Sequence, residues 1–90
     1  LLRFRVRVAS IAGNPKAESK LRFERDKLLN KLQLLRNDIG VWENNIGFFK
    51  QTESSENTIS EFHEKIEDAR KRIDNLEQKI MIIDEIEENL

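Results

Sequence analysis

Two runs of apolar residues, spaced alternately by three and four positions, dominate this chain. The first continues from Leu28 to Phe49 and the second from Ile59 to Ile83. Their members are Leu28, Leu32, Leu35, Ile39, Trp42, Ile46 and Phe49, then Ile59, Phe62, Ile66, Ala69, Ile73, Leu76, Ile80 and Ile83. This is the heptad pattern of helices that pack along a seam. The chain is therefore predicted to be all-α, with two long helices paired like a coiled coil.

A polar segment separates the two runs. Residues 50–57 contain no apolar side chain and are expected to form a loop. A short loop makes the two helices antiparallel neighbours, so the pattern predicts a long antiparallel two-helix hairpin. At 1.5 Å per residue each helix would be on the order of 50 Å long.

The expected helix ends follow from capping residues. Asn14 is a candidate N-cap, with Pro15 as the first helical residue of a helix that continues to about residue 49. Thr58 and Glu61 have the spacing of a capping box that would open the second helix, predicted over residues 58–88.

Folding the second run back on the first predicts the neighbours across the seam. Phe49 is expected near Ile59, and Trp42 near Ile66 with the small Ala69 beside it. Each seam residue thus acquires a defined partner, which fixes the register of the hairpin.

Arg25 interrupts the first run at a seam position. A charge in a seam lowers stability unless it is paired. Asp84 or Glu87, near the end of the second helix, is expected to pair with it.

The first thirteen residues admit two interpretations. Alternating apolar residues and arginines suggest a strand, whereas Leu1, Phe4, Val8 and Ile11 suit a helical stripe that ends at Gly13. The sequence offers no second strand with which the first could pair. We therefore expect a short N-terminal helix over residues 1–13, followed by the hairpin over residues 14–90. Because the chain does not begin with methionine, it is expected to be a fragment of a longer protein.

Several apolar residues lie off the seam. Leu34, Val41 and Phe48 form a second stripe with a spacing of seven. Four others lie near the open end of the hairpin: Phe23, Leu29, Ile82 and Ile86. A two-helix hairpin leaves these residues partly exposed to solvent. We expect them to be covered by the N-terminal segment, by a second copy of the chain or by the remainder of a longer protein.

Composition narrows the class of protein. Charged residues make up 37% of the chain, against about a quarter in average globular domains, which favours long solvated helices. The longest apolar run, Ile80 to Ile83, is far shorter than the roughly 20 residues that cross a bilayer. The chain has no cysteine, which fits a reducing compartment, and a cytoplasmic location is expected.

The two parts of the chain carry opposite charge. Residues 1–37 hold ten Lys or Arg and three Asp or Glu, a net charge of +7, while residues 38–90 hold six and fourteen, a net charge of −8. One interpretation is a basic arm for nucleic acid. The candidate contacts are Arg3, Arg5, Arg7, Lys16 and Lys20. The favoured interpretation is that the two parts pair and neutralise each other.

The stretch VWENNIGFFKQ, residues 41–51, combines aromatic and amide side chains at the loop end of the first helix. It is expected to be a packed hairpin tip, in which the asparagines bond freed backbone carbonyls and Gly47 marks the helix end or admits the opposite helix. The alternative is a tip that also docks a partner. The candidate contacts are Trp42, Asn44, Asn45, Phe48 and Phe49.

No motif for catalysis or cofactor binding is found. The single histidine, His63, has Glu67 one turn away, but zinc-protease helices place a second histidine there. We expect no catalytic residues, no metal, no cofactor and no small-molecule substrate.

Three stretches resemble the C-terminal region of bacterial proteins of the domain of unknown function 349 family. These are the ENNIGFF string at residues 43–49, the alanine and glycine at residues 12–13, and RFERDKL at residues 22–28. The resemblance covers nearly all of the chain. It implies an all-α bacterial protein with helical repeats upstream, which would make the N-terminal helix over residues 1–13 the end of a truncated upstream element. It implies no reaction.

The expected function is a structural or protein-interaction module, with a protein partner or self-association as a homodimer. The alternative is an arm that binds nucleic acid or ribonucleoprotein. No membrane is expected among its partners.

Overall fold

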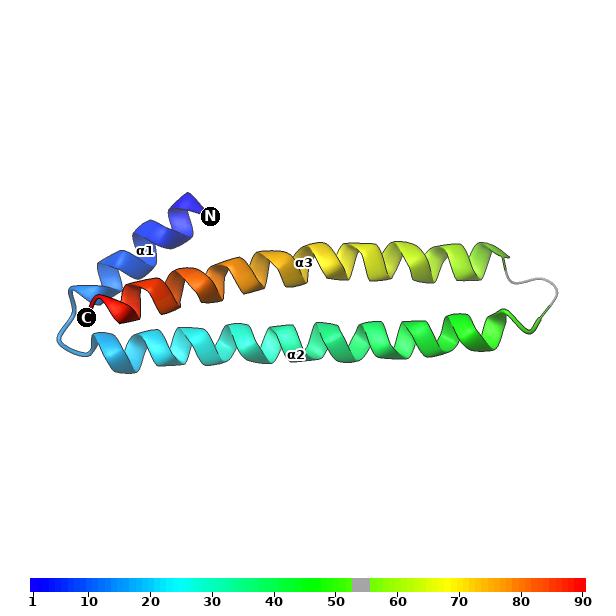
Figure 1. Cartoon of the computed structure of the whole chain (residues 1–90), viewed down its shortest axis with the longest axis horizontal. Helices are drawn as coiled ribbons and strands as arrows, with labels where there is room; N and C mark the ends of the chain where they lie inside the picture. The colour runs from blue at the N-terminus through cyan, green and yellow to red at the C-terminus, as the bar shows by residue number, and fades with distance from the viewer. Residues whose placement is uncertain (53–55) are drawn as a thin grey trace.

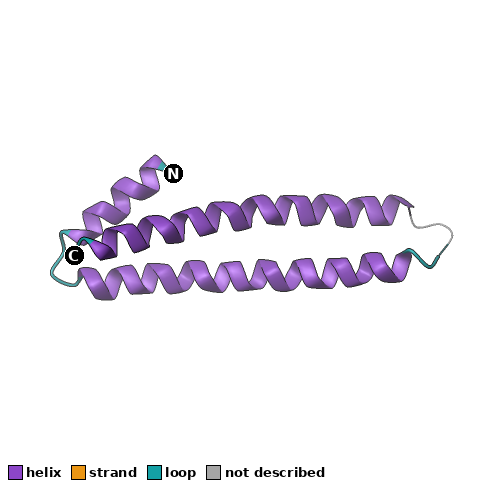
Figure 2. Cartoon of the chain, in the orientation of Figure 1, coloured by secondary structure: helices purple, strands orange, loops and turns teal. Residues whose placement is uncertain are grey.

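The computed structural model describes residues 1–52 and 56–90, and in this part of the chain it is all-α, with three helices (Figures 1 and 2). Helix α1 comprises Leu2–Ala12, α2 Ala17–Phe49 and α3 Glu56–Glu88. The helical interpretation of the N-terminal segment is thereby confirmed.

Helices α2 and α3 lie side by side as an antiparallel hairpin, and α1 packs across its open end (Figure 1). Both long helices have 33 residues, and the molecule measures 61 × 21 × 14 Å. The expected hairpin architecture is confirmed.

Helix α2 begins later than predicted. Its first residue is Ala17, whose N–H bonds to the carbonyl of Asn14 at 3.0 Å. The side-chain oxygen of Asn14 accepts the N–H of Lys16 at 2.9 Å. Asn14 therefore stabilises a turn that precedes the helix, and Pro15 lies in that turn instead of at the first helical position.

Helix α3 begins earlier than predicted. Its first residue is Glu56, so Thr58 lies inside the first turn and does not serve as the N-cap. The predicted capping box of Thr58 and Glu61 is wrong for this reason. Residues 53–55, which belong to the predicted loop, lie outside the described residues.

Gly13 follows α1 without the left-handed backbone of a glycine cap. Its φ is −79°, which any residue can adopt. Its N–H bonds to the carbonyl of Ser10 at 3.3 Å, and the N–H of Asn14 bonds to Ile11 at 2.9 Å. The chain thus leaves α1 through a tight turn.

The tightest packing lies where all three helices meet. Val8 of α1, Leu21 of α2 and Ile83 of α3 are each 0% exposed. The rest of this buried cluster comes from the heptad seams: Leu28, Leu32, Leu76 and Ile80. Each fully buried aliphatic side chain contributes about 1.5–3 kcal/mol, so α1 is an integral part of the core.

Helix α1 also covers most of the apolar residues at the open end. Ile82 is buried, and Leu29 and Ile86 are half-buried against the core. Phe4 and Ile11 of α1 pack on the same cluster. Phe23 is the exception, because its side chain stays 65% exposed.

Substitution of Val8 by alanine tests the role of α1. The change removes two methyl groups from a fully buried position and should lower the free energy of unfolding by about 1–3 kcal/mol. Val6 is the matched control, because it lies on the same helix and is 61% exposed. Urea unfolding followed by circular dichroism should show a lower midpoint for Val8→Ala and almost none of this loss for Val6→Ala. Equal behaviour of the two variants would contradict the docking of α1.

Candidate interaction surfaces

Aromatic rings link the two long helices at the hairpin tip. The ring of Phe49 stacks on Phe62 of α3, with centroids 6.0 Å apart, and meets Phe48 edge to face at 5.4 Å. The ammonium group of Lys65 lies 5.6 Å from the centroid of Phe62. Such pairs contribute about 0.5–1.5 kcal/mol beyond area burial. The tip is therefore packed, as one interpretation of the sequence expected.

The contact between Phe49 and Phe62 bears on the register. The predicted neighbour of Phe49 was Ile59, one turn earlier on α3. A seam residue inserts between successive residues of the facing helix, so the contact with Phe62 fits the same seam. Trp42 is half-buried, and the small residue predicted beside it, Ala69, is 3% exposed.

The tip asparagines do not cap the helix. The last carbonyls of α2 are bonded by the chain that follows. The N–H groups of Lys50, Gln51 and Thr52 donate to the carbonyls of Ile46, Phe48 and Phe49, and the Thr52 hydroxyl also donates to Phe49 at 3.0 Å. The side chains of Asn44 and Asn45 make no hydrogen bond with the described residues.

Gly47 neither ends the helix nor admits a close neighbour. It lies within α2, and a Cβ atom built on it would meet nothing within 4 Å in the described structure. The same is true of Gly40, seven residues earlier.

The second apolar stripe remains exposed along the outer face of α2. Leu34, Val41 and Phe48 are 64%, 56% and 65% exposed. Of the predicted tip residues, only Phe48 presents a large apolar surface to solvent, since Trp42 and Phe49 take part in the seam. Clustered exposed apolar residues mark interaction sites more often than isolated ones do.

The stripe is embedded in a face without charge. Residues at helical spacing around it from position 30 to position 51 are all amides, glycines or apolar: Asn30, Gln33, Leu34, Asn37, Gly40, Val41, Asn44, Gly47, Phe48 and Gln51. In a chain that is 37% charged, an exposed helix face of this length without charge is unusual. Inspection of the apolar residues alone missed these amides, which also repeat every seven residues.

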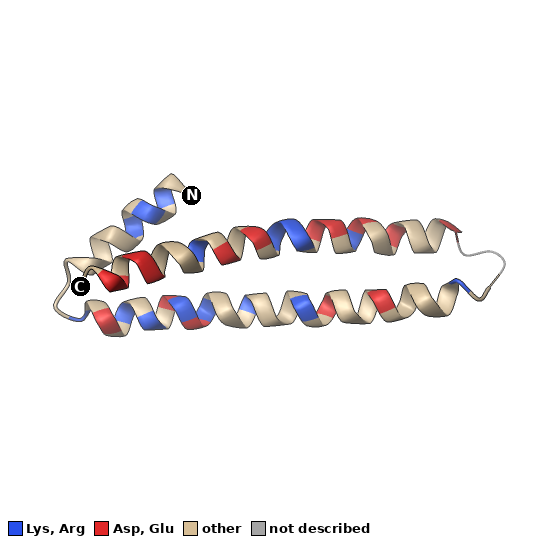
Figure 3. Cartoon of the chain, viewed as in Figure 1, with Lys and Arg blue, Asp and Glu red and all other residues tan. Residues whose placement is uncertain are grey.

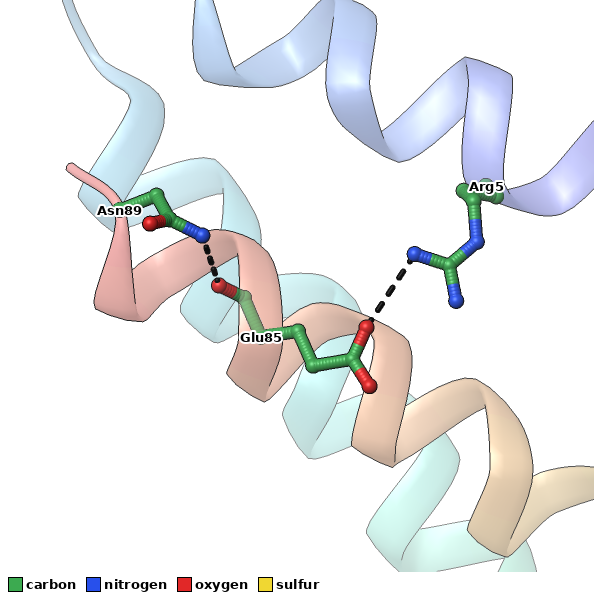
Figure 4. Close-up of polar contacts among 3 residues, drawn as sticks. All are labelled: Arg5, Glu85 and Asn89. Atoms are coloured by element: carbon green, nitrogen blue, oxygen red, sulfur yellow. Dashed lines mark hydrogen bonds and ion pairs between the residues drawn. The ribbon is translucent and has the colours of Figure 1, made fainter.

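Charged residues lie along both long helices, and at the open end the basic segments of α1 lie close to the acidic segments at the end of α3 (Figure 3). Arg5 pairs with Glu85 at 3.2 Å, joining α1 to α3 (Figure 4). Arg25 pairs with Asp84 at 2.8 Å, which is one of the two partners expected for it. Farther along the hairpin Arg36 pairs with Glu77 at 3.6 Å. These pairs join the basic N-terminal part of the chain to its acidic part.

Arg7 forms the most complete ion pair. Its two terminal nitrogens donate to both carboxylate oxygens of Glu24, at 3.0 and 3.1 Å. The guanidinium group also lies 5.4 Å from the centroid of Phe4, and Lys79 lies over the same ring at 5.3 Å. Two parallel hydrogen bonds fix orientation as well as distance, so this pair positions α1 on α2.

This pairing shifts the pKa values of both partners, Glu24 and Arg7. The hydrogen bond from Arg7 lowers the pKa of Glu24, against a smaller effect of burial, and the charges of Arg7, Lys27 and Lys31 lower it further. The same hydrogen bond raises the pKa of Arg7. The hydrogen bond with Asp84 likewise raises the pKa of Arg25.

The five predicted nucleic-acid contacts fall into two groups in the structure, those held in ion pairs and those without one. Arg5 and Arg7 are held in ion pairs. Arg3, Lys16 and Lys20 are exposed and make no ion pair with residues 1–52 or 56–90. The structure therefore brings the five cations to one end of the molecule, but uses two of them to hold α1.

His63 is exposed on α3. Among the described residues, no group of three or more His, Cys, Asp or Glu side chains is arranged to hold a metal ion. Nor does any helix in this part of the chain have the length and apolar character needed to cross a membrane.

Comparison of the chain with protein-family models, with curated proteins and with solved structures finds no match in any of the three. The resemblance to the domain of unknown function 349 family therefore stays a prediction.

Acidification tests the pair of Arg7 and Glu24. Because the pKa of Glu24 is lowered in the folded state, its ionised carboxylate stabilises the fold above the ordinary glutamate pKa. This contribution is lost as the pH falls through the lowered value. Glu24→Gln should reduce the free energy of unfolding near neutral pH by at most about 1 kcal/mol, and the difference from wild type should vanish in acid. Thermal unfolding between about pH 2 and pH 7 measures it.

Glu64 supplies the control, because it is exposed on α3 and makes no ion pair within the described residues. Glu64→Gln should follow wild type at every pH. A Glu24→Gln variant with unchanged stability at neutral pH would show that the pair does not hold α1.

Proposed function

We propose that this protein is a structural and protein-interaction module, a helical arm that performs no catalysis and requires no cofactor. The observation that carries the proposal is the uncharged outer face of α2, with Leu34, Val41 and Phe48 exposed along it. A soluble helix normally places charged residues opposite its buried stripe. Their absence here supports a role for this face in contact with another protein.

The shape of the molecule suits such a role. The hairpin is a rod 61 Å long, stiffened by a continuous seam and by cross-helix ion pairs such as Glu43 with Arg70 at 3.6 Å. In this proposal the rod presents its outer face along α2, with Phe48 next to the tip. The proposed setting is the bacterial cytoplasm, following the resemblance described above.

Site-specific photo-crosslinking tests the proposal. A benzophenone analogue of phenylalanine replaces Phe48 in the full protein expressed in its own cells, and a matched protein carries it at His63 on the exposed face of α3. Light should link residue 48 to protein, either another copy or a different chain, more strongly than residue 63. Equal or absent crosslinks at the two positions would contradict the proposed interaction face.

A nucleic-acid-binding arm is the second candidate. It is supported by Arg3, Lys16 and Lys20, which lie at the same end of the molecule and carry charges that no described acidic residue neutralises through an ion pair. Phosphate contacts of this kind require charge density and no sequence motif. The pairing of Arg5 and Arg7 with carboxylates makes it the weaker candidate.

Fluorescence anisotropy separates the two candidates. Labelled random-sequence RNA and DNA are titrated with the protein at two salt concentrations, alongside the triple variant Arg3→Glu, Lys16→Glu and Lys20→Glu. The interaction module predicts little binding in either sample. Binding that weakens steeply with salt and is lost in the variant would favour the nucleic-acid arm. These three positions leave the ion pairs of α1 intact, so loss of folding does not confuse the result.

A further inference from the structure

The outer face of α2 carries a second heptad pattern. Its positions within α2 are spaced alternately by four and three: Asn30, Leu34, Asn37, Val41, Asn44 and Phe48, with Gln51 just beyond the helix end. Toward the open end the row continues through Lys27, its one charged member, to Phe23, which is 65% exposed. At 100° per residue this row lies nearly opposite the row that faces α3. One position of each heptad is apolar and the other is an amide, so the row resembles a helix-packing seam of mixed polarity.

We propose that this face pairs with the same face of a second copy of the chain, with the two α2 helices antiparallel. The inference rests on the proposed function and names the partner. The two-fold axis passes between Leu34 and Asn37, so that Leu34 lies opposite the partner's Asn37. In this register Phe23 lies opposite the partner's Phe48 at both ends of the interface.

The aromatic residues favour this register. Phe23 and Phe48 are both 65% exposed. Phe48 lies within the uncharged face, and Phe23 lies beyond its start, with the ammonium group of Lys27 at 5.4 Å from the centroid of its ring. Antiparallel pairing about the proposed axis covers all four rings of the two chains. Large aromatic side chains dominate the energy of such interfaces when they leave water.

Charge complementarity selects the orientation. In the proposed register Lys31 lies beside the partner's Asp38, and the symmetry repeats this pair on the other side of the axis. The same register sets Lys27 opposite the partner's Asn44. Parallel pairing would instead place Lys27 against the partner's Lys27 within the interface. Shifting the antiparallel register by one heptad would bring Asp38 against the partner's Asp38. Like charges in these positions disfavour both alternatives.

The asparagines suit a contact between copies. In the proposed register Asn37 lies next to the partner's Asn37 across the axis, and Asn30 lies next to the partner's Asn44. An amide side chain carries both donor and acceptor groups, so two asparagines can satisfy each other. A purely apolar partner helix would leave these amides buried without hydrogen bonds, at a cost of about 1–3 kcal/mol each.

The interface would be modest in size. Residues 23–48 span roughly 38 Å of helix at 1.5 Å per residue, and one helix per copy contributes. Such contacts lie at the small end of specific interfaces, and polar positions in a helical seam lower its stability. The dimer is therefore reversible and depends on protein concentration.

Sedimentation equilibrium over a range of concentrations is the first test. The mean mass should rise from 10.7 kDa toward twice that value. Val41→Gln should hold the mass near that of one chain. Met81→Gln on α3, which replaces a residue 61% exposed, should dimerise like wild type. Circular dichroism confirms that each variant keeps its helices. A constant mass of one chain, or an equal effect of the two substitutions, would overturn the inference.

Cysteine crosslinking then tests the orientation, and the absence of native cysteines makes it clean. Val41 lies opposite the partner's Asn30 in the proposed register. A mixture of Val41→Cys and Asn30→Cys, treated with a short bismaleimide, should form a mixed dimer. Either variant alone should form far less of a crosslinked dimer. Efficient crosslinking of each variant with itself would indicate parallel pairing and overturn the proposal.

The outcomes separate this inference from the function on which it rests. If the protein stays monomeric while residue 48 crosslinks to a different protein in cells, the self-pairing is wrong and the interaction module stands. If the protein neither self-associates nor crosslinks through residue 48, both are wrong. Binding of RNA in the anisotropy experiment by a protein that remains monomeric would overturn the self-pairing and favour the nucleic-acid arm.

Discussion

The packing of Val8, Leu21 and Ile83 in one buried cluster brings all three helices of this small fold together. A pair of helices meets along a narrow seam, and each helix leaves the rest of its circumference in water. Where α1 crosses the open end, a third apolar surface closes the seam, and these three residues lose all exposure. Toward the loop the seam has only two helices around it, and Trp42, Phe49 and Phe62 remain half-buried.

The charges reinforce this arrangement without creating it. Ion pairs between partly exposed side chains contribute little each, but those of Arg5 and Arg7 join α1 to both long helices. The basic and acidic parts of the chain meet because the hairpin folds back, as the favoured interpretation of the charge asymmetry expected. Six of the ten basic residues in positions 1–37 make no ion pair with the described residues: Arg3, Lys16, Lys20, Arg22, Lys27 and Lys31.

Much of the architecture could be predicted because heptad spacing reports burial directly. The hairpin, the helical N-terminal segment and a carboxylate partner for Arg25 all followed from periodicity and charge. Helix starts were less predictable, since Asn14 and Thr58 have residue types that suit both caps and turns. The candidate surface was found only in part: Leu34, Val41 and Phe48 stand out as apolar, whereas Asn30, Asn37 and Asn44 gain meaning only once they are known to lie beside them on an exposed face. The helix pattern of one chain does not identify the partner of that face. The partner follows instead from the register and the charges of two paired α2 helices.

The separation between the loop and the best-packed region has a consequence for how the chain folds. Closing the hairpin near the loop costs the least chain entropy, because few residues lie between Phe49 and Glu56. Yet the fully buried contacts join Val8, Leu21 and Ile83, which are far apart in sequence. The contacts near the loop therefore cost the least chain entropy to form but are less well buried. The best-buried contacts form only when segments far apart in the sequence come together. The chain therefore has a higher contact order than its loop-end contacts alone would give, and it should fold more slowly than a helical protein of equal length whose best-buried contacts are local.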